Sequence, residues 1–513
     1  MKKYCILLSL VIITCFTSHA QKANPANAEI IYHVCQRSFF DSNGDLHGDL
    51  KGLQQKLPYL QELGVTSILL FPLYEADCYH NYFANDFDKI DPEFGSMQDY
   101  LSLVKELHRR GMKVYMDMET QYVAEKHQWW KDAVGNPGSK YSDYLLFEDS
   151  AHTIPATIIA DLRGLNSYDG SFIKITTVNL KSEKVLDYNK KLFSFFTDPN
   201  GDGKFDDGVD GFRLDHAMDN LDGKPALRNL FRDFWKPLLD YVKQINPRLQ
   251  NVAEQADWND YGFTYFEQAG VDRMFGFGLR SAILSFDKKA LIRAADTILA
   301  KCPDDKSQLI FLENHDLDRF ASLEPDIRKQ KAAAALMILI GGIPSIYYGQ
   351  EIGMLGKSVS LGNTDGNDIP RREAFEWYKK NEGPGMAFWY KNTGEWWNKS
   401  NVKTGDGISL EEQKADKGSL FNYYKQLIRL KKSNPALASG KYASAGNNNE
   451  KVFSFYRSSG NQKVLVVVNL SGEPQMANFL ESHKKANSIF GKELRQYQSI
   501  QLNPYEVAVL ELK

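Results

Sequence analysis

Short runs of β-branched and aromatic residues recur along this chain, and most are followed by a segment with helical spacing of apolar residues. The segments at 97–110 and 327–339, for example, carry apolar side chains three and four positions apart. Alternating strands and helices favour a parallel sheet. Because there are eight such units, we predict an α/β fold, a closed (β/α)8 TIM barrel with its chemistry at the carboxyl ends of the strands. The predicted strands lie at residues 30–34, 67–73, 113–119, 211–217, 251–255, 273–279, 309–314 and 343–348.

Two departures from this alternation predict additional domains. About ninety residues separate Glu119 from Gly211, where a β-α unit needs about thirty, so we expect a subdomain inserted after the third strand. After about Pro435 the pattern changes to short strand-like runs separated by Gly, Asn and Pro, which predicts a small antiparallel β domain. The predicted division is a signal peptide at 1–20, the barrel at 21–122 and 191–435, the inserted domain at 123–190 and the C-terminal domain at 436–513.

The amino terminus has the form of a secretory leader. Two lysines precede an apolar run at 4–16, and Ser18 and Ala20 place small residues at the −3 and −1 positions of a cleavage site. The run is short for a membrane span and no later stretch reaches eighteen apolar residues, so we expect a periplasmic or secreted protein without a transmembrane segment. Cys15 could instead carry a lipid anchor. Thr14 is a poor residue before a lipidated cysteine, so we favour removal of the leader after Ala20.

Charge and cysteine content narrow the class of partner. Loss of the leader would remove two lysines and no acidic residue, so the formal charge would change from −3 to −5. A near-neutral chain lacks the basic excess that nucleic acids or anionic membranes attract, so a neutral polymer or small molecule fits better. Cys35, Cys78 and Cys302 would remain, an odd number far apart, which indicates buried free thiols rather than a disulfide framework.

Polar side chains concentrate at the ends of four predicted strands, where a barrel core would need apolar ones. Carboxylates held close together cost stability and usually signal tuned pKa values, so their convergence indicates a reactive site more than helix capping. The residues are Asp117, then Arg213 with Asp215 and His216, then Glu254, then Asn314 with His315 and Asp316.

Three strings at these strand ends carry a family resemblance. Gly-Phe-Arg-Leu-Asp at 211–215, Val-Ala-Glu at 252–254 and Phe-Leu-Glu-Asn-His-Asp at 311–316 resemble the second, third and fourth signature regions of the α-amylase family of retaining glycoside hydrolases, glycoside hydrolase family 13. Order, spacing and strand placement agree across nearly the whole mature chain. The resemblance implies a (β/α)8 barrel with a B domain after strand 3 and a C-terminal antiparallel β-sandwich. It also implies an α-glucan or oligosaccharide substrate.

The resemblance assigns the catalytic roles. Asp215 would be the nucleophile, Glu254 the general acid and then base, and Asp316 the stabiliser that holds the 2- and 3-hydroxyls of the distorted sugar. Retaining chemistry requires two carboxyl groups about 5 Å apart, one protonated and one ionised. Arg213 lies two residues before Asp215 on the same strand face, so it can keep the nucleophile ionised. His315 resembles the hydroxyl-binding histidine of the family.

A further segment resembles the sugar-binding wall of the family. His80-Asn81-Tyr82 is similar to the start of the family string His-Gly-Tyr-Asp, which places Tyr82 as the ring beneath the bound glucose. Alone, a His-x-Tyr triplet is usually structural. The expected substrate-binding residues are His80, Tyr82, Asp117, Tyr122, Arg213, His216 and His315.

The first signature region departs from the family pattern. It normally contains Asp-x-x-x-Asn-His, whereas this chain has Asp117 followed by Gln121 and Tyr122. In the family that Asn commonly helps bind calcium and that His touches the 6-hydroxymethyl group, so neither role transfers directly. The Lys-His pair that follows the nucleophile in many endo-acting amylases is replaced by Met218-Asp219. Tyr122 suggests an altered subsite, with an exo-acting α-glucosidase preference as one hypothesis.

Two loops rich in Asp, Asn and Gly are candidate calcium sites. Oxygen ligands at alternate positions of a tight loop are how an EF-hand-type loop binds Ca²⁺, and the first loop also resembles a calcium loop of the family. The alternative is an Asx-rich turn capped by its own side chains. We expect structural Ca²⁺ and no organic cofactor. The candidate ligands are Asp41, Asn43, Asp45 and Asp49 in the first loop, and Asp198, Asn200, Asp202, Asp206 and Asp207 in the second.

Three functional hypotheses follow. The leading one is a secreted or periplasmic retaining α-glucan hydrolase that cleaves α-1,4 bonds of starch-derived oligo- or polysaccharides by double displacement. The second is an exo-acting α-glucosidase or a transglycosylase or isomerase of the same family, which would use the same covalent intermediate. The third is a catalytically inactive glucan-binding protein, which the retention of all three carboxylates disfavours.

Overall fold

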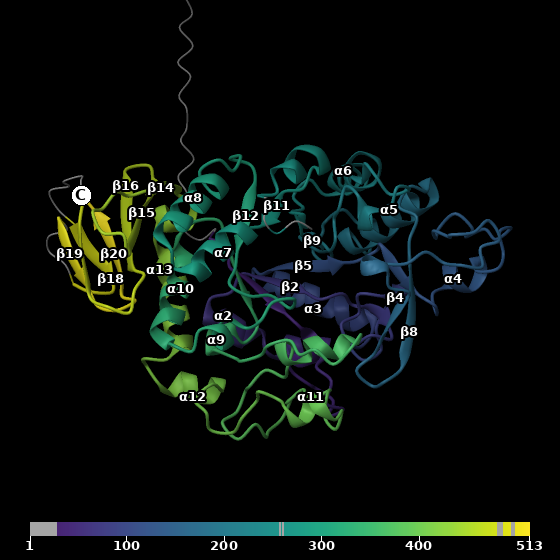
Figure 1. Ribbon diagram of the computed structural model, residues 1–513, viewed down its shortest axis with the longest axis horizontal. Helices are drawn as coiled ribbons and strands as arrows, with labels where there is room; N and C mark the ends of the chain where they lie inside the picture. The colour runs from purple at the N-terminus through teal and green to yellow at the C-terminus, as the bar shows by residue number, and fades with distance from the viewer. Residues whose placement is uncertain (1–27, 256–257, 259–260, 480–485, 494–497) are drawn as a thin grey trace, which may run out of the picture.

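The computed structural model describes residues 28–255, 258, 261–479, 486–493 and 498–513, so the predicted leader and Cys15 lie outside the described residues. Eight parallel strands form a closed barrel in the order β1-β13-β12-β11-β10-β9-β5-β2 (Figure 1). Each predicted run overlaps one of them, which confirms the fold class; only β12 begins before its predicted run, by two residues. The barrel strands are β1 Ile31–Val34, β2 Ser67–Leu70, β5 Lys113–Met118, β9 Gly211–Leu214, β10 Val252–Ala253, β11 Arg273–Phe275, β12 Ser307–Ile310 and β13 Ile343–Tyr347.

Helices cover the outside of the barrel, so most strand residues are buried on both faces and the strands appear as continuous apolar runs. The predicted helices at 97–110 and 327–339 are confirmed as α3 and α10; α3 begins with a capping box between Ser96 and Asp99. The main helices are α1 Leu50–Gln55, α2 Leu57–Leu63, α3 Met97–Arg109, α5 Glu183–Thr197, α6 Lys236–Ile245, α7 Phe277–Ser285, α8 Lys288–Ile298, α10 Ile327–Leu339 and α13 Leu420–Ser433.

The connections between these elements contain shorter helices. One of them, the 3-10 helix η8 at Asp365–Arg371, follows β13 and reaches the carboxyl edge of the barrel. The others are α9 Phe320–Leu323, α11 Glu395–Asn398, α12 Leu410–Ala415, α14 Pro435–Ser439, η2 Gln36–Ser38, η3 Ile159–Asp161, η4 Leu221–Gly223, η5 Phe231–Trp235, η6 Tyr265–Ala269 and η7 Gln350–Ile352.

A small mixed sheet projects from one side of the barrel, at the right of Figure 1. Its order is β3-β4-β6-β8-β7, with α4 Gln128–Ala133 beside it. Three of its strands lie in the long segment after β5, where the spacing predicts an insertion. The other two come from the segment between β2 and α3, and the sequence pattern did not predict them. The strands are β3 Tyr74–Ala76, β4 Ala84–Ile90, β6 Tyr122–Ala124, β7 Gly164–Asn166 and β8 Phe172–Thr177.

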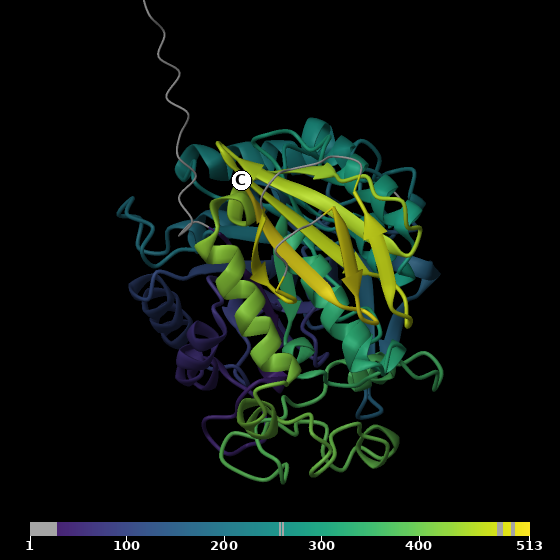
Figure 2. The same ribbon diagram turned by 90° about the vertical axis from the view of Figure 1, so that its left-hand side faces the viewer.

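The C-terminal part is antiparallel, as predicted, and its sheet lies against the barrel helices (Figure 2). Alternate residues of β15 face different cores: Phe453 and Phe455 join the core shared with the barrel, whereas Val452 and Tyr456 face the smaller pair β17-β19. Both faces are therefore apolar. The strands are β14 Lys441–Ser444, β15 Val452–Ser459, β16 Gln462–Asn469, β18 Ala486–Phe490 and β20 Val507–Leu512 in the main sheet, and β17 Gln475–Asn478 with β19 Ser499–Leu502.

The structure also bears on the cysteines and on the expected absence of a transmembrane segment. Cys35, Cys78 and Cys302 are free thiols, and the first two are buried. Within the described ranges, every helix falls short of the length and apolar character that a bilayer crossing needs.

An ion pair closes the amino end of the barrel, opposite the reactive edge. Glu29 accepts hydrogen bonds from Tyr115 and from Ser67, each at 2.7 Å, and one Glu29 carboxylate oxygen lies 2.8 Å from Arg273 Nη2. Burial alone would raise the pKa of Glu29, but Arg273, Lys113 and the Tyr115 hydroxyl together lower that pKa to about 2. The pair therefore joins the first strands of the barrel to β11.

We expect Glu29→Gln to lower the free energy of unfolding at neutral pH by about 3 kcal/mol, because the substitution leaves Arg273 buried without its counter-ion. The folded pKa of Glu29 lies below the unfolded value of 4.5. The contribution is therefore present above pH 4.5 and is lost as pH falls toward 2. Denaturant unfolding across this range measures it. Glu62→Gln, in a half-exposed pair with Lys414, should change stability by less than about 0.5 kcal/mol.

Candidate active site

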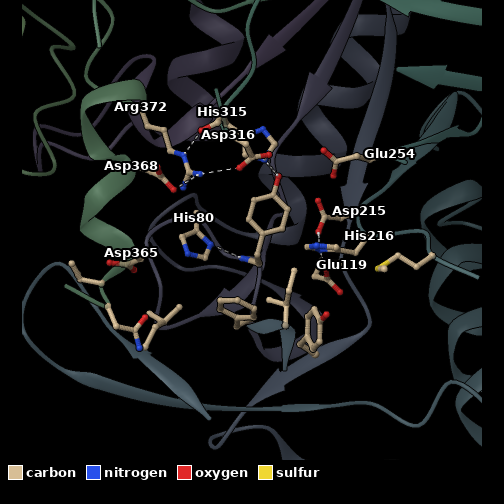
Figure 3. A pocket seen from close by; sticks show the side chains of 18 of the residues that line it. His80, Glu119, Asp215, His216, Glu254, His315, Asp316, Asp365, Asp368 and Arg372 are labelled. Atoms are coloured by element: carbon tan, nitrogen blue, oxygen red, sulfur yellow. Dashed lines mark hydrogen bonds and ion pairs between the residues drawn. The ribbon is translucent and has the colours of Figure 1, made fainter. Parts of the chain in front are cut away.

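Strand register brings the polar residues together at the carboxyl edge of the barrel. Asp117 of β5 is the direct neighbour of Arg213 in β9, and Arg213 is the neighbour of Val252 in β10. Asp215 and Glu254 each lie one residue beyond the end of their strand and two residues after Arg213 or Val252, so their side chains point to the same face as those of Arg213 and Val252. Figure 3 shows Asp215 and Glu254 side by side at one wall of the resulting cavity.

Arg213 is the centre of the charge arrangement. Its side chain is 1% exposed, and its Nη1 lies 2.8 Å from an Asp117 oxygen and hydrogen bonds to Asp215 as well. The other nitrogen, Nη2, lies 2.6 Å from Glu254 Oε2. A single buried guanidinium therefore contacts all three carboxyl groups. Because a fork of donors fixes its acceptors in direction and distance, Arg213 sets the relative positions of the three side chains.

The two central carboxyl groups have opposite pKa displacements. Burial raises the pKa of Asp215, but Arg213 and the His216 ring more than offset this and hold it well below its ordinary value. Burial also raises the pKa of Glu254, and Asp215 and Asp316 add to this, so that it reaches about 8 despite Arg213. At neutral pH one group is an anion and its neighbour holds a proton, the arrangement that acid-assisted nucleophilic displacement requires.

Tyr82 and His315 form one wall of the cavity. The Tyr82 hydroxyl lies 2.8 Å from Asp117 Oδ2 and 2.9 Å from His315 Nε2, and the two rings stack with centroids 5.4 Å apart. His80 Nδ1 accepts a hydrogen bond from the Tyr82 amide, and burial lowers the pKa of His80 well below its usual value. Burial also lowers the pKa of His315 well below its usual value, so the wall consists of uncharged rings, a suitable surface for a sugar ring.

Asp316 lies across the cavity from Asp215 and is the most exposed of the candidate catalytic groups. Its Oδ1 is 3.3 Å from Arg372 Nη2, and its Oδ2 is 3.1 Å from His315 Nε2. The Asp316 amide donates to Asn314 Oδ1, which orients the turn after β12. With 34% of its side chain exposed, Asp316 can still reach hydroxyl groups of a ligand.

Glu119 is a site residue that the sequence pattern did not single out. It is fully buried, lines the cavity and lies 3.7 Å from His216 Nδ1, which itself lies 3.0 Å from Asp215 Oδ2. Burial and the adjacent Asp215 raise the pKa of Glu119 well above its usual value. The ligand atoms of these three residues lie within 4.8 Å of one another, close enough to hold a cation. In the sequence, Glu119 is simply the last residue of a predicted strand. No sequence spacing links it to His216 or Asp215, so the sequence pattern gave no sign of its role in the site.

The two altered positions of the first signature region have different surroundings. Gln121 donates from its side chain to the backbone carbonyl of Asp215, so it supports the turn that carries that residue. Tyr122 donates its hydroxyl to Asp222 Oδ2 at 2.8 Å and packs its ring against His216 and Phe83. The Tyr122 ring lines the cavity, but its polar end is already occupied by Asp222. The sequence pattern did not predict this partner.

The cavity measures about 530 Å³ and includes side chains that sequence reasoning missed. Trp258 lies at its mouth, is 41% exposed and stacks on Phe277 with centroids 4.9 Å apart. On another wall lie Asp365, Asp368 and Arg372 from the η8 segment. The η8 segment has no regular spacing of apolar residues, so the sequence could not predict that it lies beside the cavity. The missed residues that line the cavity are Phe83, Glu119, Ile159, Leu165, Met218, Gln255, Trp258, Asn363, Thr364, Asp365, Asp368 and Arg372.

The first candidate calcium loop, residues 41–49, is organised by its own backbone. Asp41 accepts hydrogen bonds from the amides of Asn43, Gly44 and Leu46. Asp49 accepts from Ser42, and it also caps α1 through the Gly52 amide. The Asn43 side chain donates to Asp45. These contacts are those of an Asx-rich turn, and they use the oxygens that a cation would need.

The second candidate loop, residues 198–207, leaves two carboxylate oxygens free. Asp198 Oδ1 and Asp207 Oδ1 are buried without a hydrogen-bond partner among the described residues. A Cβ on Gly208 would lie 3.2 Å from the Asp198 amide nitrogen, so the two ends of the loop meet there. Asp202 instead contacts Lys204 Nζ at 3.0 Å. Two acids of one loop with unused buried oxygens fit a hard cation better than the first loop does.

Comparison with known proteins agrees with this geometry. The chain is 27% identical to alpha-amylase 3 of Dictyoglomus thermophilum over 94% of this chain and 93% of that protein. It is 26% identical to an oligo-1,6-glucosidase of Bacillus cereus, with 94% and 98% covered. The solved alpha-amylase of H. orenii superposes with a TM-score of 0.77 at 25% identity and covers 95% of this chain and 100% of its own.

Family models match both main parts of the chain. Residues 452–509 match the alpha-amylase SusG C-terminal domain. Residues 33–440 match the alpha amylase catalytic domain, and this range contains the barrel except for the first two residues of β1, together with all the carboxyl groups of the cavity. The chain therefore belongs to the α-amylase family of glycoside hydrolases.

Proposed function

We propose that this protein is a retaining α-glucan hydrolase that cleaves α-1,4-glucosidic bonds of starch-derived oligo- or polysaccharides. The observation that carries the proposal is the opposite ionisation of two carboxyl groups on one buried guanidinium, with Asp215 anionic and Glu254 protonated. Membership of the family supports the substrate class. The uncharged Tyr82 and His315 wall supports a neutral sugar as the ligand.

In the first step Glu254 donates its proton to the glycosidic oxygen as the bond to the anomeric carbon breaks. The Asp215 carboxylate forms a new bond to that carbon from the opposite face, giving a covalent glycosyl-enzyme and a released saccharide in which the former glycosidic oxygen is a hydroxyl group. Arg213 holds both groups at fixed positions, so little reorganisation accompanies the charge movement. Asp316 accepts hydrogen bonds from hydroxyls of the distorted ring.

In the second step the roles of the carboxyl groups reverse. Glu254, now ionised, takes a proton from water, the water oxygen bonds to the anomeric carbon, and the bond to Asp215 breaks. Two inversions leave the anomeric configuration unchanged. Because His216 and Arg213 stabilise the Asp215 anion, they also make it a better leaving group in this step. A sugar hydroxyl in place of water would give transglycosylation from the same intermediate.

The proposal predicts that Asp215→Asn and Glu254→Gln each reduce kcat on maltooligosaccharides by at least about 1000-fold. On an α-glucoside with a 2,4-dinitrophenyl leaving group, Glu254→Gln should regain most of the loss in kcat/KM, because that group departs without protonation. Its kcat should stay low, because the base for the second step is missing, and Asp215→Asn should regain neither. Release of reducing sugar and of dinitrophenol measures both. Asp240→Asn, on the exposed face of α6, is the matched control and should retain wild-type rates. An Asp215→Asn variant with wild-type turnover would refute the proposal.

We expect kcat/KM to fall as pH rises through about 8, because Glu254 must be protonated to act as the acid and its pKa is raised to about 8. The acid limb should lie at low pH, since the pKa of Asp215 is held well below its ordinary value. A pH profile of initial rates measures both limbs. An alkaline limb centred near pH 5 would contradict the assignment of Glu254.

We also propose that Ca²⁺ binds the second loop as a structural ion, held by Asp198 and Asp207. Support comes from their two buried oxygens without partners. The ion would supply charge compensation at the α5 to β9 connection and would not take part in the reaction. The first loop has its oxygens engaged by backbone amides, so its calcium affinity is expected to be weaker.

EDTA should therefore lower the unfolding temperature of the wild-type protein by several degrees, and millimolar Ca²⁺ should restore it. In Asp198→Asn the response to EDTA should be lost, whereas Asp45→Asn in the first loop should keep it. Thermal unfolding monitored by circular dichroism measures the shift. A wild-type unfolding temperature that does not change with EDTA would argue against the ion.

A further inference from the structure

A second cavity lies where the C-terminal sheet meets the amino end of the barrel, and we call it the junction cavity. It measures about 440 Å³, and its lining includes Glu29, at the end of the barrel opposite the reactive edge. Residues at the starts of β12 and β13, among them Lys306 and Gly342, form one side. The turn from Ser439 to Lys441, which joins α14 to β14, forms another, and Arg457 of β15 contributes its side chain. The catalytic steps leave this cavity unused.

Arg457 is a buried cation without a carboxylate partner. The residue is 3% exposed, and no Asp or Glu within the described ranges forms an ion pair with it. Burial lowers its pKa to about 10, so the guanidinium still carries its charge at neutral pH. Its Nη1 donates to the Ile340 carbonyl at 2.9 Å, and its Nε donates to the Ala436 carbonyl at 3.4 Å. These bonds leave Nη2 without a partner in the part of the chain that the structure describes.

The backbone carbonyls compensate the charge of Arg457 only in part. Ile340 follows the last residue of α10, where the carbonyl groups together carry about half an elementary negative charge. The positive potential also affects Lys431 of α13, which is 1% exposed: burial and then Arg457 lower the pKa of Lys431 well below its usual value. A buried charge without a counter-ion is costly, so this region favours a ligand that supplies negative charge.

The junction cavity contains a second cation with free donors. The Lys306 side chain is 18% exposed, and its nearest carboxylate oxygens lie 3.7 Å and 3.9 Å from Nζ, beyond hydrogen-bond distance. Its ammonium group can therefore donate to a ligand beside Arg457. The acids that line the cavity are already paired, Glu29 with Arg273 and Asp304 with Lys441.

The position of the Arg457 guanidinium depends on a glycine. A Cβ on Gly341 would lie 2.3 Å from Arg457 Nη1, so only glycine leaves room for the side chain to reach the Ile340 carbonyl. Two backbone bonds then hold the guanidinium at the cavity wall. A guanidinium presents its donors as a rigid fork that matches the oxygens of a carboxylate or a phosphate, and a fork that is already fixed loses little entropy when a ligand binds.

We infer that the junction cavity binds a phosphate group, either as inorganic phosphate or as part of a small organic phosphate, between Arg457 and Lys306. A phosphate monoester carries a charge of about −1.5 to −2 at neutral pH, and its several oxygens can accept from both cations at once. An uncharged sugar would leave Arg457 without a counter-ion, so the cavity is not a second site for the glucan. Because Lys306 belongs to the barrel and Arg457 to the C-terminal sheet, the bound group joins the two parts and stabilises the folded chain.

Titration calorimetry on the full-length protein tests this inference, with sodium phosphate and glycerol 3-phosphate as separate probes at constant ionic strength. We expect the wild type to bind at least one probe with a Kd of about 1 mM or lower. Arg457→Lys should weaken this binding at least about tenfold, because an ammonium group presents no fork. Lys306→Gln should weaken it by about three- to tenfold. Equal Kd values assign the site to the phosphate group alone, and tighter binding of glycerol 3-phosphate assigns it to an organic phosphate.

Lys441→Gln is the matched control, because Lys441 lines the same cavity but is exposed and already paired with Asp304. It should keep the wild-type Kd within about twofold. A wild type that binds neither probe would overturn the inference, and so would an unchanged Kd in Arg457→Lys. If Arg457→Lys does not fold, Lys306→Gln decides in its place, and an unchanged Kd there would overturn the inference.

Thermal unfolding provides a second measurement. About 10 mM phosphate should raise the unfolding temperature of the wild type by about 1–2 °C relative to sodium chloride at the same ionic strength, because the ligand binds only the folded chain. The rise should be absent in Arg457→Lys. An equal rise in that variant would be a general salt effect and would count against a site at Arg457.

Discussion

The site depends on one buried cation. Arg213 has almost no contact with solvent, so its charge is compensated only by the carboxyl groups around it. A buried ion pair is costly unless its geometry is good and its remaining polar atoms are satisfied, and removal of one partner leaves an unpaired charge. The guanidinium fork therefore constrains Asp117, Asp215 and Glu254 together. Three carboxyl groups can share a small volume because this cation lies between them.

The same contacts separate the protonation states of Asp215 and Glu254. Asp215 receives Arg213 on one oxygen and His216 on the other, which makes its anion stable. Glu254 is buried near that anion and near Asp316, which makes its own ionisation unfavourable. The difference comes from the number of positive partners rather than from burial, since both groups are buried. Glu119 is buried beside His216 and Asp215.

Barrel and inserted sheet contribute to the cavity in different ways. The barrel strands hold the reacting groups on a closed hydrogen-bonded framework, so their spacing is set by strand register. The inserted sheet and the η8 segment form the surrounding wall, and they are joined to each other by contacts of Asn166 with Asn363 and Thr364. Under the proposed function, chemistry and substrate choice would thus be carried by separate parts of the fold.

The amino-acid sequence by itself determined the barrel, the extra domains and the positions of the polar strand ends, because strand and helix periods and residue order are local properties of the chain. Arg213 and Asp215, two residues apart in one strand, had to share a face. The tertiary structure alone decided which distant residues meet: His216 with Glu119, Tyr122 with Asp222, and Asp365 with the cavity. These contacts join segments about a hundred or more residues apart, and they depend on how loops without periodic patterns pack against the barrel. No local spacing encodes that packing, so it could only be seen in the folded chain.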